Sequence, residues 1–193
     1  AIVQSRWFSS TNGNGTTHDI TLSSAATPGN TIIVILMGYD DVTTATVLGV
    51  AGPPSAVEDY SNTFASGRQG KAFRYSNAAS GATGFRFTTS VAHLNTAGWI
   101  LEISGLTNTT PFTGGGDFPS DFGPTELDAA VTVNAAGDIC LAAFADVPLA
   151  NITATRSGFT QSGDSNGSVL LQRNLNTGSG SITAGCTLSS NGF

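Results

Sequence analysis

Residues 27–41 read TPGNTIIVILMGYDD, and this stretch decides the fold of the chain. Pro28, Gly29 and Asn30 are turn residues, because proline presets φ while glycine and asparagine tolerate positive φ. The run that follows, TIIVILM, is β-branched or apolar throughout. A run this short that ends at Gly38 is typical of a strand buried on both faces. Such a strand needs neighbours on both sides and layers above and below it.

The composition is that of a compact and weakly charged protein. Only 10% of the 193 residues are charged, and the net charge is −6. This charge argues against nucleic acid as a partner, because phosphate binding needs clustered lysine and arginine. No apolar run approaches the ~18 residues of a membrane span, and the first residues, AIVQSRWF, lack the pattern of a signal peptide. Neutral hydroxyl- and amide-rich surfaces are common in secreted modules and virion proteins, so we expect a virion or extracellular location.

The rest of the chain consists of strand and turn signals. Residues 97–103 (AGWILEI) predict a second strongly buried strand, with Trp99, Leu101 and Ile103 on one face. No window shows helical periodicity with caps. Strands that recur every ~8–12 residues are the signature of a sandwich or barrel. We therefore predict an all-β fold, a jelly-roll-like antiparallel β-sandwich built from two related halves.

The two halves meet at residues 107–124 (TNTTPFTGGGDFPSDFGP), which have no periodicity and are dense in glycine, proline and aspartate. A loop of this length is unusual inside a compact domain, so it either crosses between sheets or has a function. The predicted division is a first β half at 1–106, the connecting loop at 107–124 and a second β half at 125–193. We expect the halves to form one compact domain.

The second half repeats the first in outline. Residues 132–146 resemble 21–40, and residues 169–188 resemble 71–88. In both halves an Asn-to-Gly turn is expected to connect a hairpin.

The second half ends without a counterpart of the strand WILEI. A sheet that lacks a strand exposes unpaired backbone groups and an apolar groove. Three ways of filling the gap are open. The N-terminal strand of residues 1–8 fills it, a neighbouring subunit donates a strand, or the printed sequence stops before the natural end of the chain.

Three motifs resemble those of a known family. They are the buried strand after the Gly-Asn turn (29–36), the turn YSNAASGAT (75–83) and WILEISGL followed by TTP (99–111). Together they resemble a widespread family of β-sandwich proteins found among bacterial surface proteins and phage structural genes. The resemblance implies a β-sandwich and a role in a virion or at a cell surface. The chain departs from the family in ending before one more apolar strand.

The sequence contains few signals of catalytic groups. No GxSxG elbow is present, and His18 and His93 stand in turn-like surroundings. Glu58 and Asp59 would serve glycoside hydrolysis only with a partner carboxylate across a cleft. We therefore expect no enzymatic activity and no cofactor.

Loop carboxylates are usually solvated, and calcium is the one metal they would suit, because they supply the hard oxygens that this ion prefers. Asp40 and Asp41, at the end of the central strand, are the weak candidate ligands. The cysteines, Cys140 and Cys186, are either buried apolar side chains or a disulfide between two strands.

The predicted interface residues are apolar and aromatic, because such side chains anchor protein contacts. They are Ile2, Val3, Trp7 and Phe8 of the N-terminal strand and Phe112, Phe118 and Phe122 of the connecting loop.

The leading functional hypothesis is a non-enzymatic structural subunit of a virion, such as a phage capsid decoration, fibre or tail component. Its expected partners are further copies of itself and other virion or surface-assembly proteins. The alternative is a carbohydrate-binding or adhesin module of a secreted bacterial surface protein, with cell-surface glycans as ligands.

Overall fold

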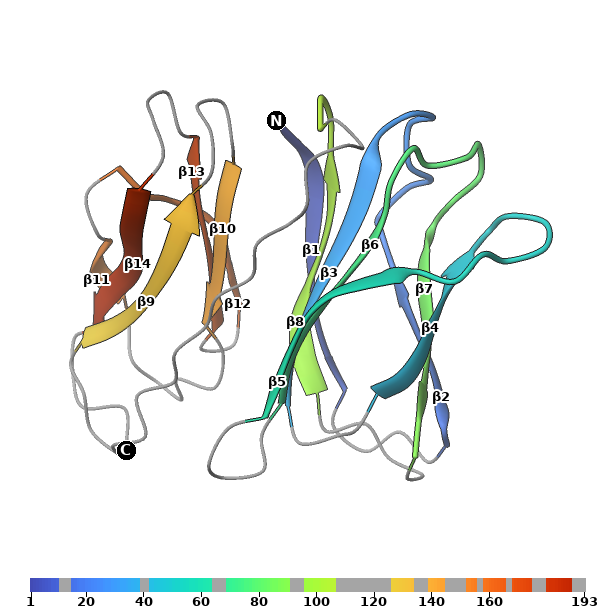
Figure 1. Ribbon diagram of the computed structural model, residues 1–193, viewed down its shortest axis with the longest axis horizontal. Helices are drawn as coiled ribbons and strands as arrows, with labels where there is room; N and C mark the ends of the chain where they lie inside the picture. The colour runs from blue at the N-terminus through green and yellow to red at the C-terminus, as the bar shows by residue number, and fades with distance from the viewer. Residues whose placement is uncertain are drawn as a thin grey trace. The chain divides into compact units, whose positions relative to one another are not determined.

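The computed structural model describes residues 1–10, 15–38, 42–63, 69–90, 96–106, 126–133, 139–144, 152–155, 158–165, 168–174 and 180–188 (Figure 1). The chain divides into two compact units, Ala1–Phe112 and Thr113–Phe193, which we call the first and the second unit. All regular elements in the described ranges are β-strands. No helix in these ranges has the length and apolar character needed to cross a membrane.

The described strands follow one another along the chain in this order: β1 (Ile2–Ser10), β2 (Thr17–Thr21), β3 (Thr31–Gly38), β4 (Val42–Leu48), β5 (Val57–Thr63), β6 (Gln69–Tyr75), β7 (Gly84–Thr89), β8 (Thr96–Ile103), β9 (Glu126–Val133), β10 (Ile139–Phe144), β11 (Ile152–Thr155), β12 (Thr160–Ser165), β13 (Ser168–Asn174) and β14 (Gly180–Leu188).

The first unit is a sandwich of two antiparallel sheets (Figure 1). A five-stranded sheet has the order β1-β8-β3-β6-β5, and a three-stranded sheet has the order β2-β7-β4. The core between them takes side chains from both sheets, and the rings of Phe73 and Phe87 lie 5.4 Å apart across it. The all-β sandwich that the sequence predicts is confirmed, and the finer jelly-roll assignment stays a prediction.

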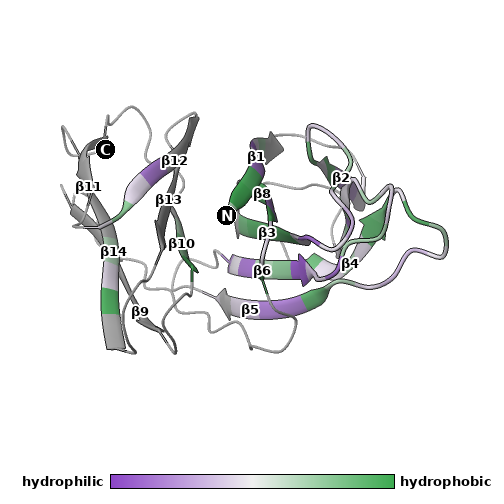
Figure 2. Cartoon of the chain, turned by 90° about the horizontal axis from the view of Figure 1, so that it is seen from above, coloured by the Kyte–Doolittle hydropathy of each residue, from purple (hydrophilic) through white to green (hydrophobic). Residues whose placement is uncertain are grey.

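Strand β3 is apolar on both faces, as its sequence predicts (Figure 2). Ile32 and Val34 belong to the core between the sheets and have no exposed surface. Because side chains alternate along a strand, Ile33 points to the opposite face, and it is only 4% exposed. Strand β3 pairs with β6 on one side and β8 on the other. It is therefore the buried central strand of the sheet.

The connections at residues 27–30 and 77–81 cross between the sheets. Gly29 has a φ of 89° in the first turn, and Asn77 has a φ of 54° in the second, as the turn residues predict. The turns are joined by hydrogen bonds from the Gly29 N–H to the Ala78 carbonyl and from the Ala78 N–H to the Asn30 carbonyl. The predicted hairpins are wrong in both halves, because β6 and β7 belong to different sheets, and so do β13 and β14. Turn residues determine local φ values and leave open which sheet the next strand joins.

The second unit contains two three-stranded antiparallel sheets, β10-β13-β12 and β11-β14-β9. Their pairing repeats that of six strands of the first unit. Strands β2 to β7 pair as β2-β7-β4 and β3-β6-β5, and strands β9 to β14 pair as β9-β14-β11 and β10-β13-β12. The predicted internal repeat is therefore confirmed at the level of topology. Strands β1 and β8 have no counterpart among the described strands of the second unit.

The repeat extends to irregularities of register. Strand β5 shifts register between Glu58 and Tyr60, where it faces β6, and β12 shifts between Gln161 and Gly163, where it faces β13. Strand β4 shifts between Val42 and Thr44 against β7, and β11 shifts in the same way against β14. Because β-bulges are specific features of a fold, matching bulges identify equivalent residues in the two units.

The first of the three ways of completing the second half is wrong. The N-terminal strand β1 pairs with β8 at the end of the five-stranded sheet of the first unit. The chain uses this strand to pair with β8 and not to complete the repeat.

Candidate assembly site at the sheet edges

Strand β1 carries four of the predicted interface residues: Ile2, Val3, Trp7 and Phe8. It pairs with β8 from Ile2 opposite Ile103 to Ser10 opposite Thr96, and its register shifts between Ile2 and Gln4. It is the outermost strand of its sheet. Of the four side chains, Val3 is exposed (51%) and the other three are half-buried.

The aromatic residues of β1 are anchors within the first unit. Trp7 lies opposite Trp99 in the strand register, and the two rings are 5.5 Å apart. Phe8 packs against the core cluster from the other face of the strand. The indole N–H groups of Trp7 and Trp99 are buried and have no hydrogen-bond partner among the described residues. These contacts hold β1 on its sheet. A role of β1 in an interface with another molecule stays a prediction.

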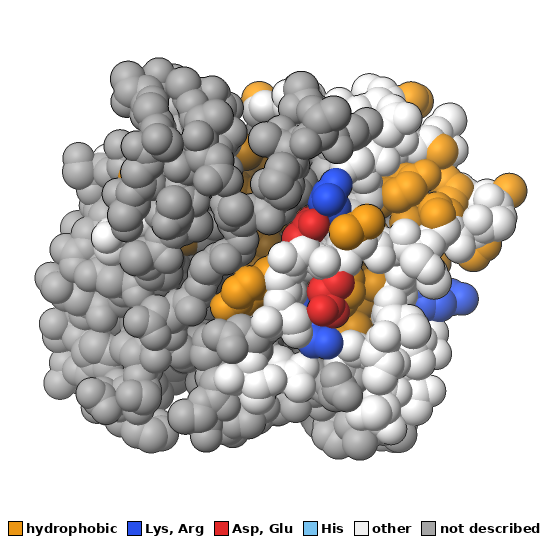
Figure 3. All heavy atoms as spheres, in the orientation of Figure 1, with side chains coloured by type: hydrophobic (Ala, Val, Ile, Leu, Met, Phe, Trp, Pro, Cys, Tyr) orange, Lys and Arg blue, Asp and Glu red, His pale blue; other side chains and the backbone are white. Residues whose placement is uncertain are grey.

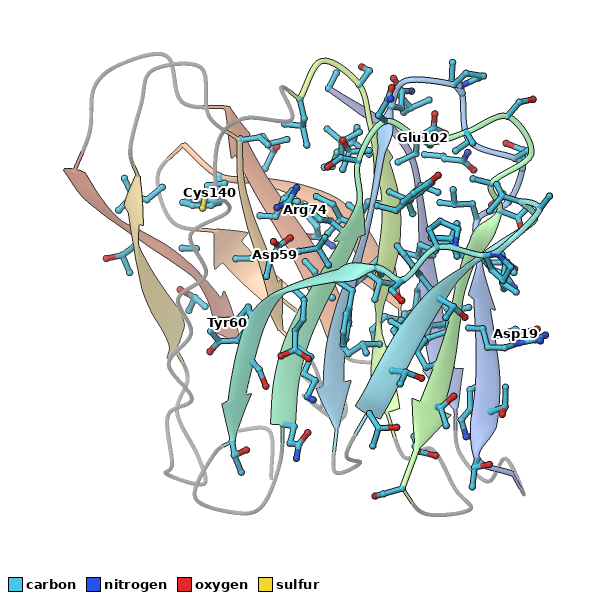
Figure 4. The ribbon with its side chains drawn as sticks, turned by 45° about the vertical axis from the view of Figure 1, so that its right-hand side comes forward. Asp19, Asp59, Tyr60, Arg74, Glu102 and Cys140 are labelled. Carbon is cyan, nitrogen blue, oxygen red and sulfur yellow. The ribbon has the colours of Figure 1, made fainter. Side chains whose placement is uncertain are left out.

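One buried carboxylate joins three segments of the first unit (Figure 4). Glu102 on β8 is only 1% exposed. Its Oε1 accepts hydrogen bonds from the Thr27 N–H (2.8 Å) and from Asn30 Nδ2 (2.6 Å), and its Oε2 accepts one from Gln4 Nε2 (2.6 Å). Glu102 therefore ties β8 to β1 and to the turn that precedes β3. The sequence signal for this role was a single glutamate inside the apolar strand WILEI.

The hydrogen bonds determine the ionisation of Glu102. Burial acts to raise its pKa, and the hydrogen bonds from Gln4, Asn30 and Thr27 outweigh burial, so that the pKa lies below its ordinary value of 4.5. A donor that points at a carboxylate favours its charged form. The folded first unit therefore holds Glu102 as an anion.

This lowered pKa predicts acid sensitivity of the first unit. A carboxyl group with a lower pKa in the folded than in the unfolded state stabilises the fold above its unfolded value and loses this effect as the pH falls. We expect the urea midpoint of wild-type protein to decrease more steeply below pH 4.5 than that of Glu102→Gln. Tryptophan fluorescence measures this, because both tryptophans lie in the first unit. Parallel pH profiles of the two proteins would contradict the assignment.

Two further carboxylates of the first unit, Asp19 and Asp59, form ion pairs with arginines. Arg86 donates two hydrogen bonds of 2.7 Å to Asp19 on an exposed face. Hydrogen bonding from Arg86 lowers the pKa of Asp19. Arg74 Nε lies 2.8 Å from Asp59 Oδ2. Burial raises the pKa of Asp59 more than Arg74 lowers it. Figure 3 shows acidic and basic side chains side by side on the described part of one face, among neutral side chains.

The remaining predicted site residues are an acidic residue, metal ligands, a cysteine and aromatic residues of the connecting loop. Glu58, which would serve glycoside hydrolysis only with a partner carboxylate across a cleft, lies 3.5 Å from the ammonium group of Lys71. Within the described ranges, no three histidine, cysteine or acidic residues lie together as a metal site would require. Cys140 is buried, and the choice between a buried apolar side chain and a disulfide with Cys186 stays a prediction. Five predicted residues lie outside the described residues: Asp40, Asp41, Phe112, Phe118 and Phe122.

The described sheets end in eight edge strands: β1 and β5, β2 and β4, β10 and β12, and β9 and β11. Natural proteins protect such edges from further pairing with bulges and charged residues. Five of the eight contain a register shift, namely β1, β4, β5, β11 and β12. Of the other three, β2 carries Asp19, and β9 carries Glu126 and Asp128.

Strand β10 is the exception among these edges. Its sequence, ICLAAF, contains no charged residue, and its register with β13 is regular throughout. The sequence predicts that the second half lacks a counterpart of WILEI, and it does not identify the strand next to the missing one. The signal that identifies β10 is its equivalence to the central strand β3.

Comparison of the chain with protein-family models, with curated proteins and with solved structures found no match.

Proposed function

We propose that this protein is a non-enzymatic structural subunit that assembles through β-strand pairing, as a virion component such as a phage capsid decoration, fibre or tail protein. The observation that carries the proposal is the edge of β10. This strand is apolar, regular and paired only with β13 among the described strands. An unprotected edge presents unpaired N–H and C=O groups to another chain. Strand addition at such an edge is a recurring mode of protein association.

The composition supports the same role. A low proportion of charged residues and an abundance of glycine, serine, threonine and asparagine suit a surface that is covered in an assembly. The resemblance of the strand and turn motifs to phage structural and bacterial surface proteins points in the same direction. Gln4 and Trp7 of β1 contact Glu102 and Trp99 of its own sheet, and the proposal places the strand pairing at β10 of the second unit.

The proposal predicts that a charge on β10 prevents assembly. Leu141 is half-buried and alternates with the buried Cys140, so its side chain points away from the face that Cys140 occupies. We expect Leu141→Lys to weaken self-association at least about tenfold, since a charged side chain on an edge strand opposes pairing. Light scattering after size exclusion, over a range of protein concentrations, measures the effect.

The matched control is Thr44→Lys. Thr44 is exposed on the edge strand β4, where the register is already shifted. This variant adds the same charge and should associate as the wild type does. Circular dichroism of both variants verifies that they are folded. A wild-type chain that stays monomeric at millimolar concentration, or equal association of the two variants, would overturn the proposal.

A further inference from the structure

We propose that β10 accepts an antiparallel strand of the type of β8, donated by another polypeptide of the assembly, in the register that β8 takes on β3. The inference rests on the proposed function, because it names the partner of the same edge. It adds the side-chain pattern and the register of the donated strand.

The matching bulges show which residues of β10 and β3 are equivalent. In the first unit the bulge of β5 faces Phe73 and Ala72, and in the second unit the bulge of β12 faces Leu171 and Leu170. Leu171 therefore corresponds to Phe73. Because Val34 pairs with Phe73 and Ala142 pairs with Leu171, Ala142 corresponds to Val34.

The pairing of β3 with β8 then predicts the donated strand. Val34 lies opposite Ile100, Ile35 opposite Trp99, and Leu36 opposite Gly98. The equivalent residues of β10 are Ala142, Ala143 and Phe144. Two alanines replace a valine and an isoleucine, so a large apolar side chain and an aromatic one are expected opposite them.

The position of the donated strand opposite Phe144, which corresponds to Gly98 of β8, requires glycine. A Cβ atom at Gly98 would lie against the backbone carbonyl oxygen of Ile35. The equivalent backbone position in the second unit is that of Ala143, so the donated strand needs a glycine opposite Phe144 for the same close approach of two backbones.

One position of the donated strand should differ from β8. Ile32 lies opposite Glu102, and the residue equivalent to Ile32 is Cys140. In the first unit Glu102 receives a hydrogen bond from Gln4 on β1, and β1 has no counterpart among the described strands of the second unit. A buried carboxylate that loses a donor is costly. The donated strand should therefore carry an uncharged residue there.

A synthetic peptide tests the proposal. Its sequence, TAGWILTI, is that of β8 with threonine in place of Glu102, and lysines at both ends keep it soluble. We expect it to bind the full chain in a 1:1 complex, measured by fluorescence anisotropy of a labelled peptide. The unsubstituted peptide, TAGWILEI, should bind at least about tenfold more weakly. Binding to the Leu141→Lys variant should also be at least about tenfold weaker, because that charge lies at the edge.

The thiol of Cys140 gives a second readout. In a Cys186→Ala background it is the only thiol of the chain, and it becomes accessible to labelling reagents when β10 opens. A strand bound at the edge of β10 should slow this labelling at least about tenfold at saturating peptide. An unchanged labelling rate would contradict binding at β10.

Backbone methylation distinguishes strand pairing from adventitious apolar binding. Alternate N–H groups of a strand point to opposite neighbours, so methylation of one alternate set should abolish binding and methylation of the other set should not. Equal effects of both sets, or no binding at all, would overturn the inference. Full protection of all β10 amides from hydrogen exchange in the peptide-free monomer would also overturn it, because the edge would then be covered by its own chain.

The outcomes separate this inference from the proposed function. Peptide binding without any edge-dependent assembly supports the strand site and counts against the structural role. Assembly that Leu141→Lys abolishes, without peptide binding, supports the structural role and overturns the donated strand of this type.

Discussion

Replacement of Glu102 by leucine is expected to lower the free energy of unfolding of the first unit by about 3 kcal/mol or more, since each hydrogen bond to a charged group contributes about 1.5–3 kcal/mol. The substitution keeps the side-chain volume and removes the acceptor of three hydrogen bonds. Gln4, Asn30 and the Thr27 backbone would each lose a partner. Urea unfolding followed by tryptophan fluorescence measures the loss in the first unit alone.

The control for this prediction is Glu58→Leu. The Glu58 side chain is 43% exposed and lies 3.5 Å from Lys71, and such partly exposed pairs contribute about 0–1 kcal/mol. We also expect Glu102→Gln to cost less than Glu102→Leu, because its amide oxygen still accepts from two of the three donors. A loss of equal size in the two leucine variants would show that Glu102 is not the link between β8, β1 and the turn.

The repeat was visible in the sequence because strand and turn signals recur in the same order. The run TIIVILM and the run WILEI are short, apolar and bounded by turn residues, and both form central strands. The path between strands was harder to predict. The turn at residues 77–81 has the positive φ values that its asparagine and glycine favour. Its direction depends on the need to place β6 and β7 in different sheets over one core.

The role of Glu102 could not be deduced from the sequence. Its partners Gln4 and Asn30 are 98 and 72 residues away, and no local pattern connects them. A glutamate in an apolar strand predicts either an exposed face or a buried network, and only the three-dimensional structure distinguishes the two. For Trp7 and Phe8 the sequence correctly indicated an apolar strand, whereas the partner strand β8 required the register.

The identification of β10 as an edge among the described strands depends on both kinds of information. The sequence indicates that the second half repeats the first, and the structure shows that β10, the equivalent of β3, pairs only with β13 among the described strands. The bulge in β12 determines how β10 aligns with β3, and in this alignment Ala142 corresponds to Val34. A sequence alignment alone leaves this register free to slip, and a slip of one residue would exchange the two faces of the strand.

Substitution of Gly98 by alanine tests whether the close approach of β8 and β3 is essential. Gly98 lies in β8 between Leu36 of β3 and Phe8 of β1. A Cβ atom there would lie against the Ile35 carbonyl oxygen and 3.0 Å from the Phe8 ring. Because the oxygen belongs to the backbone of a central strand, the ladder must separate to admit a methyl group. We expect a loss of about 3 kcal/mol in urea unfolding of the first unit.

Two further variants identify the cause of this loss. Gly15→Ala introduces a Cβ with no atom within 4 Å, so its effect should be small. The double variant Phe8→Ala/Gly98→Ala relieves the contact with the ring and leaves the contact with the backbone. If the backbone contact dominates, the double variant is no more stable than Gly98→Ala. Recovery of stability in the double variant would instead assign the strain to Phe8, and the donated strand on β10 would then need no glycine opposite Phe144.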